Sequence, residues 1–342
     1  MLRNATAPQC IFKVWKLIRM PQTNIQIPTR QSAAFFWWVQ NTFTSSELSR
    51  FLNLLSNQMK DGRELLHRPE KILALAASVL SEERQDLLHR AHLRPTDSAS
   101  QPNLITKFEI ELLICRRLPP DFPLALRYSG NPQLLALKRV GIVGSRHPTF
   151  YGREQAARFA RTLAESGVCV VSGAAIGIDT VANLIGHNSG ASVAVLGSGL
   201  GVPYPRANSA LFRCMENSGR GLVLSEFPDQ QRAEKWNFPK RNRIIAALCD
   251  FLMVIEAGVR SGTMITAQLA ADIGVDVGAL PGPVYSPTSQ GSNLLIKDGA
   301  FCVENPEEIL ERLANLGHQK DATRETSTDD ASVLPRTHPT LF

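Results

Sequence analysis

The sequence predicts an α/β protein built on a doubly wound, Rossmann-like parallel sheet, with a small all-helical domain before it. The first observation is a series of short, almost continuously apolar runs of β type, at 140–144, 168–172, 192–196, 221–224, 251–255 and 276–280. The second is the helical pattern that separates or follows them, at 152–166, 179–188, 206–218, 242–248, 262–273 and 305–315. Strands that are apolar on both faces need helices on both faces, and this alternation is typical of a doubly wound sheet.

Helical periodicity also precedes the first strand. Ser45-Ser-Glu-Leu begins one helix there, and Pro69 lies near the first turn of the next. We expect a helical accessory domain over residues 1–117, a Rossmann-like domain over 118–316 and a disordered polar tail over 317–342. The aromatic cluster at 35–38 is expected to belong to the core of the helical domain.

Composition excludes several classes of protein. The six cysteines are scattered and form no Cys-x-x-Cys pair, which is typical of a reducing, cytoplasmic chain. The seven histidines form no ligand cluster, so we expect no metal site. No apolar run is long enough to span a bilayer, so we expect no membrane segment.

Positive charge is concentrated in one short stretch. Residues 131–316 are nearly neutral, yet residues 232–243 hold five cations against one acid. Within that stretch, Lys-Trp-Asn-Phe-Pro-Lys-Arg-Asn-Arg at 235–243 interleaves two aromatic rings with four cations. Cations release counterions from phosphates and unpaired bases stack on rings, so this run is typical of a site for single-stranded nucleic acid. The alternative is a solvated loop with an ordinary core Phe.

Two loops at predicted strand ends favour an anion. In an open parallel sheet, ligands bind beyond the carboxyl ends of the strands. Ser145 and Arg146 follow the first strand and bring a hydroxyl and a guanidinium close to a helix start, which suits a phosphate; the alternative is an Arg that braces a neighbouring loop. The segment Ser261, Gly262 and Thr263 begins another helix and offers a second anion seat; the alternative is a plain Ser N-cap.

Two glycine-rich loops do not match nucleotide fingerprints. Residues 172–179 have Gly-x-x-x-Gly spacing and end at Asp179, which we expect to cap a helix. Residues 197–205 lack Gly-x-Gly-x-x-Gly and contain prolines that prevent a helix start. Since no Walker loop occurs either, we expect no cofactor. Residues 281–285 are expected to form a wall of the same cleft.

Several motifs together resemble the DNA-processing protein A (DprA/Smf) family. They are Gly-Ser-Arg-x-Pro-x-x-Tyr-Gly at 144–152, Ser-Gly-x-Ala-x-Gly-Ile-Asp at 172–179, Val-Leu-Gly-x-Gly at 195–199 with Tyr204-Pro205, Leu-Ser-Glu at 224–226, Phe-Pro-x-Arg-Asn-Arg-Ile-Ile at 238–245, Ser-Gly-Thr-x-x-Thr-Ala at 261–267 and Pro281-Gly282. The resemblance covers about residues 118–303. It implies a Rossmann-like protein that binds single-stranded DNA, forms a homodimer through the sheet domain and loads a RecA-type recombinase during natural transformation.

The resemblance also implies positions for the DNA site. It places Ser145, Arg146, Lys235 and Phe238 in the binding pocket, Arg241 and Arg243 in the same signature, and the segment 261–263 on the rim. Two residues depart from the family pattern: Asn183 stands where a His is usual, and Val275 where an Arg is usual. These departures bear on local packing or on one phosphate contact.

The leading hypothesis is a binding protein without catalytic residues, which protects incoming single-stranded DNA and loads the recombinase. In it Arg146, Lys235, Lys240, Arg241 and Arg243 neutralise the backbone, while Phe238, joined by Trp236, stacks bases. A purely structural interaction module for a recombinase is compatible with this hypothesis.

The rival hypothesis is a nucleoside-monophosphate N-glycosidase of the cytokinin-activating type. Glu226 and Glu256 follow strands, where a catalytic carboxylate could stand. That family's Gly-Gly-x-Gly-Thr-x-x-Glu pattern aligns with residues 260–266, however, and puts Thr266 at the catalytic Glu position. We therefore expect both glutamates to pair with nearby arginines.

Overall fold

The computed structural model describes residues 103–325, with side chains up to 315, and the isolated residues 39, 43, 46, 47, 50, 51, 54, 74 and 76–80 before them. The described chain forms one nine-stranded sheet in the order β1-β2-β6-β5-β4-β3-β7-β8-β9. Its strands are β1 (Asn103–Thr106), β2 (Ala125–Gly130), β3 (Arg139–Val143), β4 (Cys169–Ser172), β5 (Ala191–Leu196), β6 (Gly221–Ser225), β7 (Phe251–Val254), β8 (Asp276–Ala279) and β9 (Phe301–Cys302). The six strands predicted from apolar runs are confirmed to within two residues at each end.

The sheet is parallel from β6 through β3 to β9, and the two antiparallel pairings are those of β2 with β1 and with β6. The order runs outward from β3 in both directions, with β4 on one side and β7 on the other. This reversal is the topological switch point, where open α/β sheets bind ligands beyond the strand ends. The sequence prediction missed β1, β2 and β9, which lie toward the two edges of the sheet. Some residues of each of these strands are partly exposed, so the strands are not continuously apolar.

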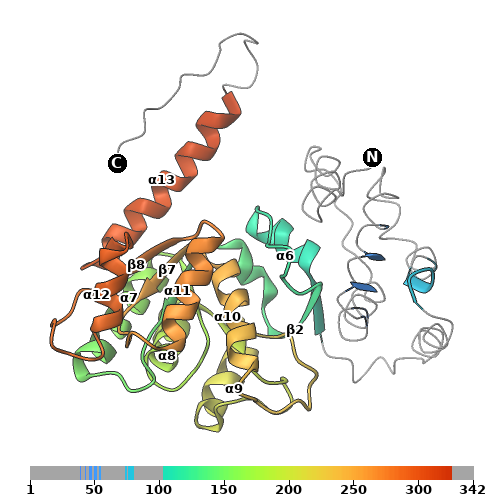
Figure 1. Cartoon of the computed structure of the whole chain (residues 1–342), viewed down its shortest axis with the longest axis horizontal. Coiled ribbons are helices and arrows are strands. Elements are labelled where there is room, and N and C mark those ends of the chain that lie inside the picture. The colour runs from blue at the N-terminus through green and yellow to red at the C-terminus, as the bar shows by residue number, and fades with distance from the viewer. Residues whose placement is uncertain are drawn as a thin grey trace.

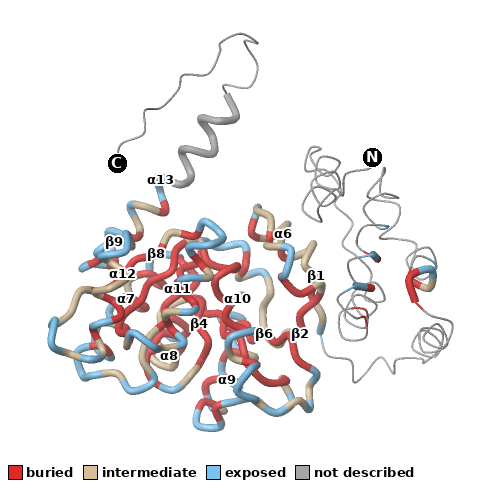
Figure 2. Tube along the Cα trace, in the orientation of Figure 1, coloured by how far each residue is buried: buried red, intermediate tan, exposed pale blue. Residues whose placement is uncertain are grey.

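Helices cover both faces of the sheet, as predicted for continuously apolar strands (Figure 1). Their bounds are α6 (Lys107–Ile114), α7 (Phe150–Glu165), α8 (Ile178–Ser189), α9 (Ser209–Asn217), α10 (Asn237–Leu248), α11 (Gly262–Asp272), α12 (Gln290–Lys297) and α13 (Pro306–Glu325). One face packs against α7, α8, α9 and α13, and the other against α6, α10, α11 and α12. Figure 2 shows the buried strands between these two layers.

The helix α10 is fixed to the sheet at its C-terminal end. The Nε of Arg139 donates to the carbonyl of Leu248 at 2.7 Å, and the Nη2 of Arg116 donates to the carbonyls of Ala247 and Cys249 at 2.6 and 2.5 Å. The carboxylate of Asp250 accepts from the Nη2 of Arg139 at 2.8 Å. These bonds satisfy carbonyls that a helix end leaves without partners. The helix that carries residues 237–243 is therefore a firmly anchored element.

The domain limits differ from those expected. Strand β1 and helix α6 belong to the sheet domain, because Ile105, Ile110 and Ile114 are buried in its core. That domain therefore includes residues 103–117, which the sequence analysis placed in the helical domain. At the other end, α13 continues to Glu325, into the segment expected to be disordered. The aromatic cluster at 35–38 and residues 326–342 lie outside the described residues.

Over the described ranges, no helix is both long and apolar enough to cross a membrane. The same residues hold no group of three or more metal-ligating side chains. The five cysteines among them are free thiols.

Candidate nucleic-acid interface

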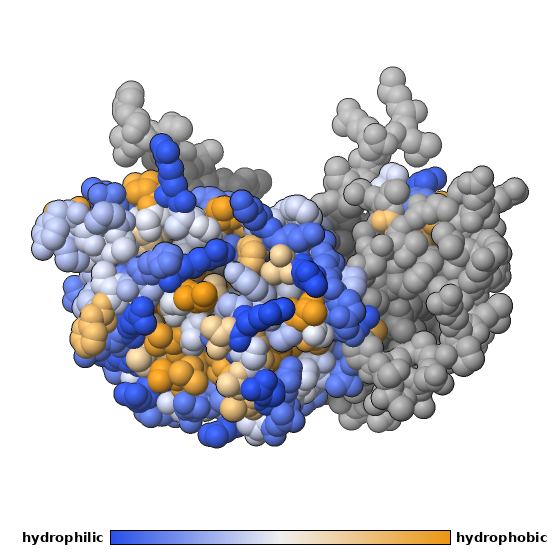
Figure 3. All heavy atoms as spheres, turned by 90° about the horizontal axis from the view of Figure 1, so that it is seen from below, coloured by the Kyte–Doolittle hydropathy of each residue, from blue (hydrophilic) through white to orange (hydrophobic). Residues whose placement is uncertain are grey.

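The carboxyl ends of the parallel strands bring the predicted loops together on one side of the molecule. Figure 3 views the molecule from this side and shows hydrophilic and hydrophobic side chains intermingled on it. The loops after β3, β5, β6 and β7 all contribute. We call this surface the strand-tip site.

The basic and aromatic run at 235–243 spans a helix start and is not a loop. Helix α10 begins at Asn237, five residues earlier than predicted, with Trp236 as its N-cap. Asn237 is fully buried, and its Nδ2 donates to the carbonyls of Gly197 and Arg232 at 3.0 and 3.4 Å. This bond ties the helix start to the loop after β5. Lys235 and Trp236 are exposed beside it, and the Trp236 side chain is 67% accessible.

Phe238 lies at the centre of a cluster of three side chains. The Cζ of Arg146 lies 5.2 Å from the centroid of the Phe238 ring. The ring of Tyr204 lies 5.9 Å from that centroid, at an interplanar angle of 57°. We call Arg146, Tyr204 and Phe238 the ring cluster. The backbone of Gly197 makes room for it, because a Cβ there would lie 2.9 Å from the Cδ1 of Phe238.

The loop after β3 presents Arg146 to solvent. The Oγ of Ser145 accepts from the backbone N–H of His147 at 3.1 Å, and the carbonyl of Ser145 accepts from the N–H of Ile178. Gly177 packs against this loop with φ +99°, and a Cβ there would lie 2.3 Å from the carbonyl oxygen of Ser145. Only glycine adopts this conformation readily. The tight packing fixes the loop and leaves the Arg146 side chain exposed.

The start of α11 lies beside the same loop. The Oγ1 of Thr263 donates to the carbonyl of Gly144 at 3.1 Å. Ser261 is the N-cap residue, and its buried Oγ has no hydrogen-bond partner within the described structure. Gly262 is exposed, with open space where a Cβ would be. The three residues predicted to form an anion seat are therefore next to Ser145 and Arg146.

Arg241 does not reach the surface. Its side chain is buried at 4% exposure, and its Nη1 donates to the carbonyls of Gly173 and Val195. The prediction that it contacts phosphate does not fit this position, because the side chain is buried, its Nη1 is bonded to two backbone carbonyls and its Nε donates to the Oδ1 of Asn242. Asp179, predicted to cap α8, is also buried. The N-cap of that helix is Gly177.

Lys240 and Arg243 both form ion pairs with Glu226. The Oε1 of Glu226 lies 3.3 Å from the Nζ of Lys240 and 2.5 Å from the Nη2 of Arg243. Arg243 also donates to the carbonyl of Asp121. The predicted pairing of Glu226 with a nearby arginine is confirmed. Both cations are thus partly neutralised, which weakens their expected role at the phosphate backbone.

The second strand-tip acid has a different partner from the one predicted. Glu256 accepts from the backbone N–H and the Oγ1 of Thr149, at 3.0 and 2.5 Å. Thr149 is the N-cap of α7. Glu256 therefore stabilises a helix start, and the prediction that it pairs with an arginine is wrong.

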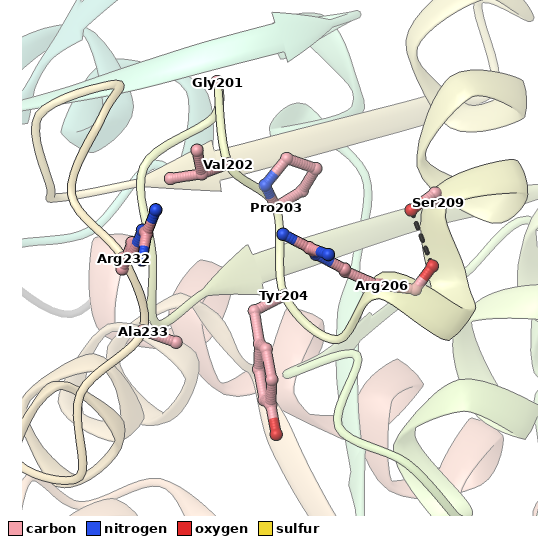
Figure 4. Close-up of a pocket in the computed structure, with 8 residues that line it drawn as sticks. All are labelled: Gly201, Val202, Pro203, Tyr204, Arg206, Ser209, Arg232 and Ala233. Atoms are coloured by element: carbon pink, nitrogen blue, oxygen red, sulfur yellow. Dashed lines mark hydrogen bonds between the residues drawn. The ribbon is translucent and has the colours of Figure 1, made fainter.

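Sequence reasoning missed a pocket next to the ring cluster (Figure 4). Its volume is about 520 Å³, and its lining residues are Gly201, Val202, Pro203, Tyr204, Arg206, Ser209, Arg232 and Ala233. Arg206 and Arg232 extend from opposite sides toward the backbone of residues 202–204. Both are exposed. The feature of the sequence that could have predicted this pocket is Arg206, a cation directly after Tyr204-Pro205 in the loop that follows the buried strand β5.

The two departures from the family pattern are both packing positions. Asn183 is buried on α8, where its Nδ2 donates to the Oγ of Ser192 and the carbonyl of Val193 at 2.9 Å. Val275 is 5% exposed and lies in the core just before β8.

A family model for DNA recombination-mediator protein A matches residues 110–314, which include every site residue described above. The chain belongs to this family. It is 41% identical to Protein Smf of Escherichia coli over 223 residues, and 41% identical to the DNA processing protein DprA of Streptococcus pneumoniae over 191 residues. These alignments cover 65% and 56% of this chain, and 56% and 67% of the two relatives. The chain therefore spans little more than half the length of the first relative.

Solved structures of family members share this fold. The S. pneumoniae protein superposes with a TM-score of 0.65 at 30% identity, covering 83% of this chain and 98% of that one. DNA processing protein A of Helicobacter pylori superposes with a TM-score of 0.54 at 28% identity, covering 64% of this chain and 98% of that one. The H. pylori structure is described in terms of a single-stranded DNA binding mode.

Proposed function

We propose that this chain binds single-stranded DNA at the strand-tip site and leaves it chemically intact. The observation that carries the proposal is the ring cluster, in which the cation of Arg146 lies 5.2 Å from the centroid of Phe238 at the start of α10. A cation attracts a phosphate and an aromatic ring can stack an unpaired base, so a cation beside a ring suits a single strand. In a duplex the bases are stacked and paired inside, so the ring has no base face to meet.

Together with Arg146 of the ring cluster, three further exposed cations give the site four. Lys235 is exposed just before the start of α10, and Arg206 and Arg232 line the pocket together with Tyr204. None of the four forms an ion pair with a described carboxylate. A strand that crosses Tyr204 would meet these cations, with the seat at 261–263 as an additional anion contact. Lys240 and Arg243 are secondary contacts in this proposal because they share the negative charge of Glu226 and are partly neutralised by it.

The proposal includes a role in recombination. Membership of the family of DNA recombination mediators supports a cytoplasmic homodimer that protects incoming single-stranded DNA and passes it to a RecA-type recombinase during natural transformation or recombination. The rival glycosidase activity has little support at the strand tips. Glu226 and Glu256 are tied to neighbouring residues, and Thr266, at the position of the catalytic Glu, is 3% exposed and donates to the carbonyl of Gly262 at 3.2 Å.

The proposal is tested by titrating the protein with labelled oligothymidylate and with a duplex of equal length, at several salt concentrations. If about four phosphates are neutralised, the logarithm of the binding constant should fall with the logarithm of salt at a slope near −3, at about 0.7 per phosphate for a single strand. Arg146→Ala and Lys235→Ala should each flatten the slope by about 0.7. Equal affinity for the duplex, slopes unchanged in both variants, or release of free base from a nucleoside monophosphate would refute the proposal.

A further inference from the structure

Arg241 is a buried cation directly beneath the ring cluster. It lies on α10 three residues after Phe238, close to one helical turn, so both side chains face the sheet. One nitrogen of its guanidinium donates to the carbonyls of Gly173 and Val195, which belong to the ends of β4 and β5. Gly173 permits this approach, because a Cβ there would lie 2.5 Å from the Nη1 of Arg241.

Asp179 is a second buried charge, and it attracts Arg241 electrostatically. It is 7% exposed and lies in the first turn of α8. Burial raises the pKa of this carboxyl, while the Arg241 charge and hydrogen bonds from the backbone of Ala175, Gly144 and Gly173 oppose the rise. Burial likewise lowers the pKa of Arg241 to about 10, against the attraction of Asp179. Taking two charges out of water costs more than the pair usually returns in stability, so the pair calls for another role.

The segments that this pair joins are the ones that carry the strand-tip site. Gly144 directly precedes Ser145 and Arg146. Val195 lies two residues before Gly197, against which Phe238 packs. The third segment is the start of α10 itself. Arg241 and Asp179 thus connect the loop after β3, the ends of β4 and β5, and α10 through bonds that lie below the surface.

We propose that Arg241 and Asp179 form a buried positioning pair that presets Arg146 and Phe238 for single-stranded DNA without touching the strand. This inference rests on the proposed function. Binding is weakened when side chains and loops must be ordered at the moment of association. Ordering them during folding removes that cost. The guanidinium suits the task because it carries five N–H donors, so Nη1 can bond both carbonyls while Nε donates to the Oδ1 of Asn242.

The test compares Arg241→Lys with Arg139→Lys. Arg139 is a similarly buried arginine that donates to the carbonyl of Leu248, at the opposite end of α10 from Phe238, and to the carbonyl of Leu135. Both variants keep the positive charge and lose the planar guanidinium with its five N–H donors. Arg241→Lys should bind oligothymidylate about 10-fold more weakly, the order expected when two side chains must be ordered on binding, with an unchanged salt slope. Arg139→Lys should lose thermal stability and keep wild-type affinity.

A double variant separates binding from folding. Asp179→Asn with Arg241→Met removes both charges, which restores stability relative to either single change, because no unpaired charge stays buried. It should remain folded by circular dichroism and still bind about 10-fold more weakly, as the links between the loops are gone.

Three results would overturn the inference alone. The first is a salt slope flattened by about 0.7 in Arg241→Lys, because this would make Arg241 a phosphate contact. The second is wild-type affinity in either Arg241→Lys or the double variant. The third is a loss of affinity in Arg139→Lys equal to that in Arg241→Lys. If the wild-type protein does not bind single-stranded DNA, the proposed function is wrong and this inference is wrong with it.

Discussion

The sharpest prediction concerns the ring of Phe238. The Phe238→Ala change removes the side chain that lies between Arg146 and Tyr204, with the Arg146 cation 5.2 Å and the Tyr204 ring 5.9 Å from its centroid. A base that stacks on an aromatic ring contributes roughly 1–3 kcal/mol. The cation–ring contact that steadies Arg146 adds about 0.5–1 kcal/mol at an exposed site. Taken together, these figures predict a loss of affinity of about 10-fold to several hundred-fold for oligothymidylate.

The salt dependence separates this loss from a loss of charge. Phe238→Ala removes no cation, so the slope of log affinity against log salt should stay at the wild-type value. The assay is fluorescence anisotropy with a labelled oligothymidylate at several salt concentrations. Phe238→Leu is the matched control, since it keeps apolar bulk beside Gly197 and lacks a ring; it should lose most of the affinity that the Ala variant loses.

A strand of abasic sites provides the decisive comparison. It carries the same phosphates without bases, so Phe238→Ala should lose only the cation–ring part of its affinity for this strand, about 0.5–1 kcal/mol, and less than it loses for oligothymidylate. If the variant binds oligothymidylate as well as the wild type does, or loses equal affinity for the abasic strand, then Phe238 does not stack bases and the reasoning from the ring cluster is wrong.

Three further predictions follow from single contacts. Gly197→Ala places a Cβ 2.9 Å from the Cδ1 of Phe238 and should weaken oligothymidylate binding at constant salt slope; wild-type affinity would show that the ring position is unimportant. Glu226→Gln removes the acid 3.3 Å from Lys240, so affinity at low salt should rise and the slope should steepen, whereas an unchanged slope would contradict the ion pair. Burial lowers the pKa of His187 below 6.5 in the folded protein, so as pH falls the unfolded chain takes up this proton before the folded chain does. The free energy of unfolding should therefore fall as pH drops below 6.5. In urea titrations, His187→Asn should show a smaller fall over the same pH range.

The sequence predicts the sheet and the location of the site well because both depend on simple patterns. Strands buried on both faces must be apolar throughout, so six runs mark six strands. Ligands bind beyond the carboxyl ends of such strands, so the loop residues that follow them are the natural candidates. Arg146 and Phe238 are brought together by this topology alone, although 91 residues separate them in the chain.

Burial of charged residues is what the sequence pattern could not show directly. A count of cations treats Arg241 and Lys240 alike, yet the first is 4% exposed and the second has a side chain 52% exposed. The difference comes from helix register. Once α10 begins at Asn237, positions 241, 244, 245 and 248 share the face toward the sheet, and all four are buried. Pro239 in the first turn marks this start, but a helix predicted from residue 242 leaves Arg241 in a loop.

The distribution of unpaired charge also changes the path expected for a bound strand. Read from the sequence, the cations at 235–243 suggest a strand that runs along that segment. In the structure Arg241 is buried, and Lys240 and Arg243 share an ion pair with Glu226. Lys235 is therefore the one cation of that run that stays exposed without an ion pair to a described carboxylate. Three further exposed cations, Arg146, Arg206 and Arg232, lie on the loops after β3, β5 and β6. Attraction is therefore spread across the strand tips, with Phe238 and Tyr204 between the cations, and a polyanion gains most by crossing these loops at an angle to α10.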